Sequence, residues 1–300
     1  MTVWHESGLA KAKPVCSKKG KTVARKFIFD TDWFTDCDDC VALRFLARNL
    51  DKEHQLLGVN VSARTEDAYV SIYAFLQSEK VDCPIGVESE SFYFEPVHYQ
   101  KNMAKGVART NENVCSSIEL YKKILEENDD VEIISVGFLS SIERVFKAYP
   151  QLIEKVKAIW IMGGDWRQQG GKEYNFCAGG NAYAVQASRF VVNELPCKQV
   201  YLGFEVGESV ITGNELDKDD ILFEAMKDWG AETGRCSWDP MTVMLAFHDK
   251  FQGAFEYVVG KASVDENGAN YFEKDENGRQ AFVVKTKPDT YYQEVINGSL

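Results

Sequence analysis

Five aspartates lie within ten residues near the start of the chain, in the stretch FIFDTDWFTDCDDCVAL (27–43). They are Asp30, Asp32, Asp36, Asp38 and Asp39. Carboxylates this close repel one another, so a folded protein must protonate some of them, hydrate them or supply a cation. All the available ligand atoms are oxygens, which are the ligands that Ca²⁺ and Mg²⁺ prefer. The stretch therefore predicts a site for a hard divalent cation.

Helix capping and thiol chemistry are the simpler explanations of the same residues. Aspartates at the start of a helix near Asp38 or Asp39 would satisfy free N–H groups and the helix dipole, but capping needs only one or two of the five. Cys37 and Cys40 form a C-x-x-C, yet no second C-x-x-C completes a zinc site. The eight cysteines are spread singly along the chain, which favours reduced thiols over a disulfide framework.

A phosphatase is an alternative interpretation of the first two aspartates. FIFDTD resembles the strand and Asp-x-Asp that open the aspartyl phosphatases of the haloacid dehalogenase type, which use Mg²⁺. Those enzymes have Thr or Val four positions after the first aspartate. This chain has Phe34 there and Thr35 one residue later.

The elements that position the aspartates alternate regularly along the chain. Short apolar segments typical of buried strands take turns with helical patterns, which indicates right-handed βαβ units on a sheet covered on both faces. The expected strands are 26–30, 54–62, 83–87, 131–138, 157–164 and 198–205, and the expected helices are 40–50, 66–80, 117–128, 139–149 and 181–194. The fold class is thus α/β, with a mostly parallel, doubly wound (Rossmann-like) sheet flanked by helices.

The ends of the chain follow different patterns. Beyond Gly207 the sequence is mainly helical (217–230 and 239–247), and Asn277-Gly278 between two apolar runs predicts a small hairpin within 269–284. Residues 1–24 are polar and basic without a sustained period, so we expect a flexible arm. Residues 25–300 are expected to form a single domain.

Parallel sheets bind ligands beyond the carboxyl ends of their strands. The loops after Phe29, Val61, Val136, Met162 and Phe204 are therefore expected to converge. A site built there would join the aspartate cluster to residues far along the chain.

Composition narrows the partners. The formal charge of −12 argues against nucleic acid, which requires a clustered basic face. The sequence contains no run of eighteen apolar residues, so we predict no membrane span. The N-terminus has no apolar segment of the kind found in signal peptides. We expect a cytoplasmic protein that acts on a small molecule.

The segment DTDWFTDCDDCVAL (30–43) resembles the nucleoside hydrolase family of the inosine-uridine preferring type, in its subgroup with a loop two residues longer. Three further family features follow in order: the strand and loop IISVGF, WIMGGDW followed by KEYNF, and SWDP. The chain departs from the family at Phe34, where the subgroup usually has glycine, and at AGGNAYA (178–184), where an Asp-Pro pair is usual.

The resemblance implies calcium-dependent hydrolysis of the N-glycosidic bond of ribonucleosides, giving ribose and the free base. It implies that the ligands of Ca²⁺ are Asp32, Asp39, the main-chain carbonyl of Val136 and Asp239. The catalytic residues it implies are Asp32, the general base, and Asp38, which with Glu173 and Asn175 binds the ribose. Asp36 is an alternative to Asp32 because the loop is longer, and Asp30 is expected to be structural.

The base-binding residues depart from the inosine-uridine type. That type has a histidine immediately before the late aspartate, whereas this chain has Trp238, as in the purine-specific branch. Indole rings stack on purines, so Trp238 is expected to bind a purine or modified purine. Trp166, Trp33 and His98 are further candidates. A homo-oligomer, dimer or tetramer, is expected, and a non-catalytic riboside-binding protein of the same fold remains an alternative.

Overall fold

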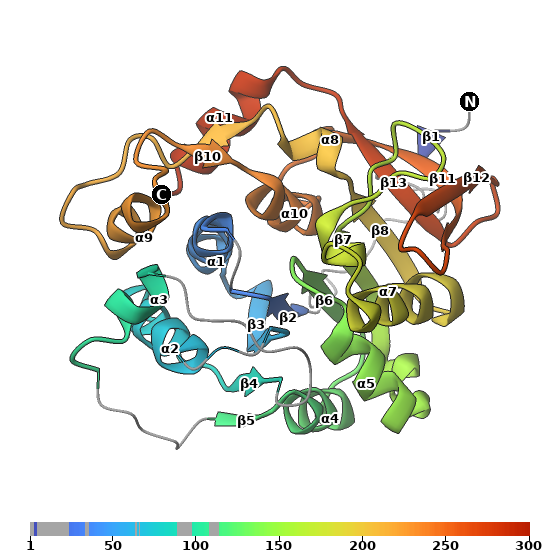
Figure 1. Cartoon of the computed structure of the whole chain (residues 1–300), viewed down its shortest axis with the longest axis horizontal. Helices are drawn as coiled ribbons and strands as arrows, with labels where there is room; N and C mark the ends of the chain where they lie inside the picture. The colour runs from blue at the N-terminus through green and yellow to red at the C-terminus, as the bar shows by residue number, and fades with distance from the viewer. Residues whose placement is uncertain are drawn as a thin grey trace, which may run out of the picture.

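A mostly parallel sheet runs through the middle of the molecule (Figure 1). The computed structural model describes residues 3–4, 24–33, 36–63, 65, 67–88, 98–107 and 114–300. Eight strands are parallel, in the order β5 (Val114–Ser116), β4 (Ile85–Val87), β3 (His54–Val61), β2 (Arg25–Thr31), β6 (Val131–Ser135), β7 (Val156–Met162), β8 (Lys198–Leu202) and β13 (Gln280–Lys285). The α/β fold class predicted from the sequence is confirmed.

Helices cover both faces of this sheet (Figure 1). One face packs against α1 (Asp38–Asn49), α2 (Ala68–Ser78) and α10 (Trp238–Ala246), and the other against α4 (Ser117–Glu127), α5 (Ser140–Ala148) and α7 (Ala182–Glu194). Successive side chains of strand β2 point to opposite faces of the sheet, so this strand contributes to both hydrophobic cores. Phe27 and Phe29 lie in one core, and Ile28 lies in the other.

The remaining elements are short or lie at the ends of the sheet. They are β1 (Val3–Trp4), α3 (His98–Met103), a 3₁₀ turn (Pro150–Lys155), α6 (Tyr174–Cys177), α8 (Phe204–Gly207), β9 (Ile211–Thr212), α9 (Ile221–Trp229), β10 (Arg235–Cys236), β11 (Phe255–Val264), β12 (Asn270–Lys274) and α11 (Asp289–Asn297). Strand β1 pairs with β11. The expectation for residues 1–24 otherwise falls almost entirely outside the described residues.

The predicted hairpin differs from the structure in its pairing. Strands β12 and β13 flank the Asn277-Gly278 turn as expected, but both pair antiparallel with β11 instead of with each other. Strand β11 is long enough for β13 to pair with its first half and β12 with its second half, the two meeting at Gly260. A Cβ atom on Gly278 would come within 2.1 Å of the Gly260 carbonyl oxygen, so glycine is required where the turn crosses.

The order of the strands locates the expected crevice. From β2 the chain proceeds outward through β3, β4 and β5, then returns to place β6 on the other side of β2 and continues through β7 and β8. The order in which the chain adds strands therefore reverses between β2 and β6, and doubly wound sheets bind ligands at this position. Asp32 follows the first of these strands and Val136 the second.

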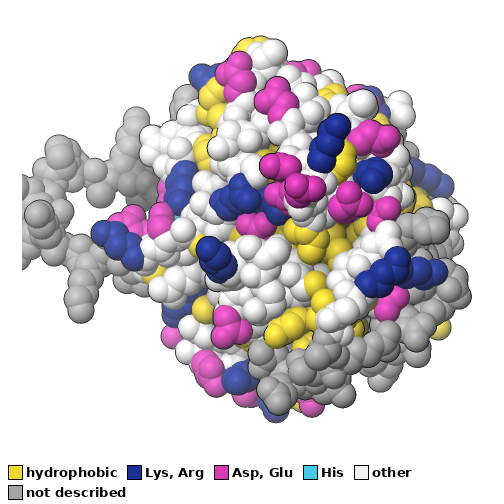
Figure 2. Space-filling model, turned by 90° about the vertical axis from the view of Figure 1, so that its left-hand side faces the viewer, with side chains coloured by type: hydrophobic (Ala, Val, Ile, Leu, Met, Phe, Trp, Pro, Cys, Tyr) yellow, Lys and Arg dark blue, Asp and Glu magenta, His cyan; other side chains and the backbone are white. Residues whose placement is uncertain are grey.

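The surface carries charges of both signs. Figure 2 shows acidic and basic side chains interspersed over one face of the molecule. Across the described part of the chain, none of the helices is long and apolar enough to cross a bilayer.

Candidate functional site

A cavity of about 540 Å³ opens at the carboxyl ends of the strands. This volume lies in the range of small-molecule sites. Of the predicted site residues, those that line it are Asp32, Asp38, Asp39, Val136, Glu173, Asn175, Trp238 and Asp239. Segments separated by more than a hundred residues in the sequence thus meet at one place.

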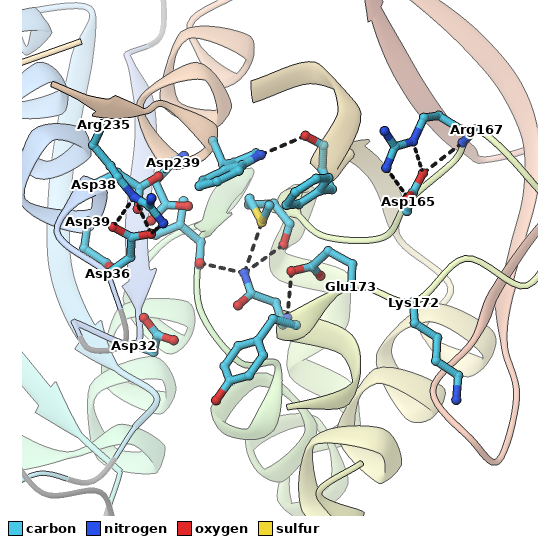
Figure 3. A pocket seen from close by; sticks show the side chains of 16 residues that line it. Asp32, Asp36, Asp38, Asp39, Asp165, Arg167, Lys172, Glu173, Arg235 and Asp239 are labelled. Atoms are coloured by element: carbon cyan, nitrogen blue, oxygen red, sulfur yellow. Dashed lines mark hydrogen bonds and ion pairs between the residues drawn. The ribbon is translucent and has the colours of Figure 1, made fainter. Parts of the chain in front are cut away.

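Three carboxylates form the floor on one side of the cavity (Figure 3). Asp38 and Asp39 lie in the first turn of α1, and Asp239 lies in the first turn of α10, which packs against α1. Each offers an oxygen, and these oxygens lie within 4.8 Å of one another. Two helix N-termini therefore point at the same cluster, and their partial positive charge favours anions there.

The electrostatics of this cluster suit a cation. Burial raises the pKa of Asp38 and Asp239, and the neighbouring carboxylates raise it further. Burial also raises the pKa of Asp39 to about 7, although the Thr31 hydroxyl, which donates a hydrogen bond to this carboxylate, opposes the rise. Within the described residues, no lysine or arginine forms an ion pair with these three side chains. The donor set is that of a Ca²⁺ or Mg²⁺ site.

Asp32 and Val136 approach the cluster from the ends of β2 and β6. The Asp32 side chain is a hydrogen-bond neighbour of Asp39, but it lies outside the group of three. A Cβ atom on Gly137 would come within 2.2 Å of the Asp32 main-chain nitrogen, so glycine allows the two loops to touch. Val136 lines the cavity, and its carbonyl accepts a hydrogen bond from Asn175 Nδ2 at 2.8 Å.

Glu173 and Asn175 form the floor on the opposite side. Glu173 caps α6: its Oε1 accepts from the Asn175 main-chain N–H at 2.8 Å, and its Oε2 accepts from that of Gly164 at 3.2 Å. Burial raises the pKa of Glu173 to about 7, against the lowering effect of these N–H groups. Glu173 lies across the cavity from the three aspartates (Figure 3), and Asn175 lines the same cavity.

Aromatic rings and arginines form the upper wall. The Trp238 ring lies 5.1 Å from that of Phe204, and Trp238 Nε1 donates to the Phe204 carbonyl at 2.7 Å. The Arg235 guanidinium lies 5.4 Å from the centre of the Trp238 ring and pairs with Asp36. Arg167 lies 5.7 Å from the centre of the Phe204 ring. The sequence patterns did not predict Phe204, Arg235 or Arg167 as site residues. They placed Phe204 inside a strand that was expected to span 198–205.

The other two aspartates of the opening cluster have supporting positions. Asp30 is fully buried, and its Oδ2 accepts from Tyr121 at 2.6 Å and from Asn60 at 2.8 Å. The phosphatase alternative requires Asp30 to attack a substrate, which this burial prevents. Asp36 lines the cavity, but both of its oxygens accept from Arg235.

Two of the aromatic candidates do not line the cavity, and the side chain of the third is not described. Trp166 is buried among Phe176, Tyr201 and Phe282, and its Nε1 donates to the Gly163 carbonyl. Trp33 is fully buried and donates to Ser71 Oγ. His98 is the first residue of α3, and its side chain lies outside the described residues. Among the described residues, the aromatic rings that line the cavity are those of Trp238, Phe204 and Tyr174.

Comparisons with known proteins agree with this geometry. The family model described as inosine-uridine preferring nucleoside hydrolase matches residues 27–292. A search of curated protein sequences finds no match.

Several solved structures share the fold. A plant nucleoside hydrolase has 17% identity and a TM-score of 0.71, over 91% of this chain and 99% of that chain. The inosine-uridine preferring nucleoside hydrolase of Bacillus anthracis has 17% identity and a TM-score of 0.67, over 92% and 100%. A purine-preferring ribonucleoside hydrolase from Gardnerella vaginalis has 15% identity and a TM-score of 0.70, over 92% and 99%.

Proposed function

This chain belongs to the inosine-uridine preferring nucleoside hydrolase family, and we propose that it hydrolyses purine or modified-purine ribonucleosides with the help of Ca²⁺. Membership makes it a hydrolase of N-ribosyl compounds. The observation that carries the finer proposal is the meeting of Asp39 and Asp239 beneath the aromatic pair Trp238 and Phe204.

Ca²⁺ fits the residues at the floor of the cavity. Asp32, Asp39, Asp239 and the Val136 carbonyl would hold the ion, and all four are oxygen donors in the irregular set that Ca²⁺ tolerates better than Mg²⁺. When bound, the ion would neutralise the buried carboxylates, make an attacking water more acidic and bind ribose hydroxyls. Asp38, although it lies in the same group, is assigned to the ribose 2′-hydroxyl.

The side chains of the floor perform the sugar chemistry. Asp32 accepts a proton from the attacking water, and Asp38 accepts a hydrogen bond from the ribose. Glu173 and Asn175 hold the other side of the sugar. As the C1′–N bond breaks, the ribose acquires oxocarbenium character, and the surrounding carboxylates stabilise this positive charge.

The aromatic wall selects the base. Trp238 cannot protonate the leaving base, because its only N–H donates to the Phe204 carbonyl. It contributes apolar aromatic area beside Phe204, which favours a bicyclic purine over a pyrimidine.

A nucleoside panel tests the proposal. The wild-type protein with Ca²⁺ should release reducing sugar from purine ribonucleosides faster than from uridine, and a chelator should abolish the release. Binding of ribosides without turnover would instead identify a non-catalytic member of the fold. Release of inorganic phosphate from phosphate esters would contradict the proposal.

We also propose the cellular and physical state. The protein would be a cytoplasmic homo-oligomer, dimer or tetramer, with residues 25–300 as a single domain. The described cysteines are free thiols, as suits a reducing compartment. Light scattering after size exclusion measures the oligomeric state, and a monomer would contradict it.

A further inference from the structure

The departure of the base has no assigned helper in this cavity. Trp238 stands where the inosine-uridine type has a histidine, and its N–H is already used. A base that leaves without assistance carries developing negative charge on its nitrogen, which a hydrogen-bond donor would stabilise. The question is therefore which donor on the cavity wall is available.

Most donors that line the cavity are committed to protein acceptors. The committed pairs are Trp238 with Phe204, Asn175 with Val136, Arg235 with Asp36, and Arg167 with Asp165 and Glu208. Among the described side chains that line the cavity, two other donors remain, Lys172 and Tyr174. Figure 3 shows the Lys172 amine directed away from the carboxylates. The Tyr174 phenol has no hydrogen-bond partner among the described residues.

The main chain at Tyr174 is anchored on both sides, and its side chain is 46% exposed. It is the first residue of α6, between Glu173 and Asn175, whose contacts fix the main chain. Its ring lies 5.9 Å from the ring of Phe138, which is fully buried in the loop after β6. The phenol is therefore presented from a rigid support.

The depth of the cavity separates the sugar from the base. The groups assigned to the ribose are nearly inaccessible: Asp38 is 3% exposed, Glu173 6% and Asn175 8%. The aromatic groups lie nearer solvent, with Trp238 and Phe204 half-buried and Tyr174 exposed. We expect the base of a ribose bound at the floor to lie in this more exposed part of the cavity, which Tyr174 also lines. Partial burial and the charge of Asp32 raise the pKa of Tyr174, so the phenol keeps its proton at neutral pH.

We propose that Tyr174 donates a hydrogen bond to the base of the bound riboside and stabilises it as it leaves. This inference rests on the proposed function and names one residue of the same site. The electron pair of the C1′–N bond passes to the base nitrogen, and the water oxygen bonds to C1′ while a water proton passes to Asp32. The base then takes a proton from solvent, to which Asp32 returns its own, and Tyr174 keeps its proton throughout.

The test compares leaving groups of different quality. Wild type and Tyr174→Phe are assayed on inosine or guanosine, whichever wild type hydrolyses faster, and on its N7-methyl derivative. The methylated base already carries a positive charge and leaves as a neutral molecule, so it needs little help. Tyr174→Phe should lower kcat about 10- to 100-fold on the ordinary nucleoside and leave kcat on the methylated one within about threefold.

Tyr183→Phe is the matched control, because Tyr183 is 62% exposed on α7 and does not line the cavity. It should leave both rates unchanged, and thermal unfolding should show that both variants fold. An unchanged kcat in Tyr174→Phe, or an equal loss on both substrates, would overturn the role of Tyr174 while the proposed function stands. A wild-type protein that hydrolyses neither substrate would overturn both.

Discussion

Two clusters of acidic side chains lie at opposite ends of the same strands, and they differ in whether a cationic side chain compensates their charge. At the amino ends, Arg25 contacts both Glu132 and Asp249, and the two ring nitrogens of His54 each lie 2.8 Å from a carboxylate oxygen of Asp51 or Asp249. At the carboxyl ends, Asp38, Asp39 and Asp239 face one another, and no cationic side chain of the described chain pairs with them.

The pKa shifts follow this difference. Burial works against the ionised form of Glu132, but hydrogen bonds and charge from Arg25 lower its pKa overall. Burial raises the pKa of Asp38, and neighbouring aspartates raise it further. Buried charges that are paired within the protein need no ligand, whereas buried like charges without a partner are typical of functional sites. We therefore interpret the amino-end cluster as structural and the carboxyl-end cluster as functional.

The largest test of this contrast removes a member of the unpaired cluster. Asp39→Ala and Asp239→Ala should each lower kcat/KM by at least about 1,000-fold, since loss of the ion forfeits several kcal/mol of transition-state stabilisation. Calorimetry should show the loss of Ca²⁺ binding. The free energy of unfolding of Asp239→Ala without metal should not fall, because this change relieves repulsion. Retained hydrolysis would show that the metal site lies elsewhere.

A second pair of variants separates two aspartates of the same loop. Asp32→Asn should lower kcat about 100- to 10,000-fold, because it removes the proposed general base. Asp36→Asn should change kcat less than about tenfold, since Asp36 is paired with Arg235 and supports the wall around Trp238. Rates at saturating nucleoside measure both. The opposite ranking would show that Asp36 replaces Asp32 as the base.

The paired cluster should respond in stability instead of rate. Glu132→Gln leaves Arg25 short of its main partner and removes the charge that accepts from Trp160 Nε1 at 2.9 Å. Breaking a buried pair in this way should lower the free energy of unfolding by about 3 kcal/mol. Urea unfolding measures this change. The kcat of the folded enzyme should stay within about twofold, because Glu132 lies at the opposite end of β6 from the cavity. A large fall in kcat would erase the distinction between the clusters.

The sequence was most informative where chemistry is tied to local motifs. Apolar runs predicted the strands, and the resemblance of successive motifs to the nucleoside hydrolase family implied that Asp39, Glu173 and Asp239 belong to one site. Their convergence follows from the reversal of the sheet between β2 and β6.

Local sequence patterns did not predict the direction in which individual side chains point. Trp166 and Trp238 both follow strands, yet only Trp238 reaches the cavity. At Gly164, where φ is +83°, a Cβ atom would come within 2.6 Å of the Trp166 ring, so the turn folds this ring back into the core. Phe272 and Phe282, more than a hundred residues later, complete its surroundings. Pairings that distant leave no local signal.

Two buried glutamates give the finest test, because their pKa values shift in opposite directions. Burial raises the pKa of Glu173 from 4.5 to about 7, so its contribution to stability is complete below pH 4.5 and is lost as pH rises toward 7. The lowered pKa of Glu132 has the opposite effect: its contribution to stability is present above pH 4.5 and is lost as pH falls through the folded value.

Without metal, wild type should lose stability between pH 5 and pH 8, and in Glu173→Gln this loss should be smaller by about 2 kcal/mol. Glu132→Gln should leave that loss intact, since its carboxylate is ionised in the folded protein throughout this range. Urea unfolding of the three proteins at both pH values measures the difference, and parallel profiles for wild type and Glu173→Gln would show that Glu173 is ionised in the folded cavity before any ligand binds.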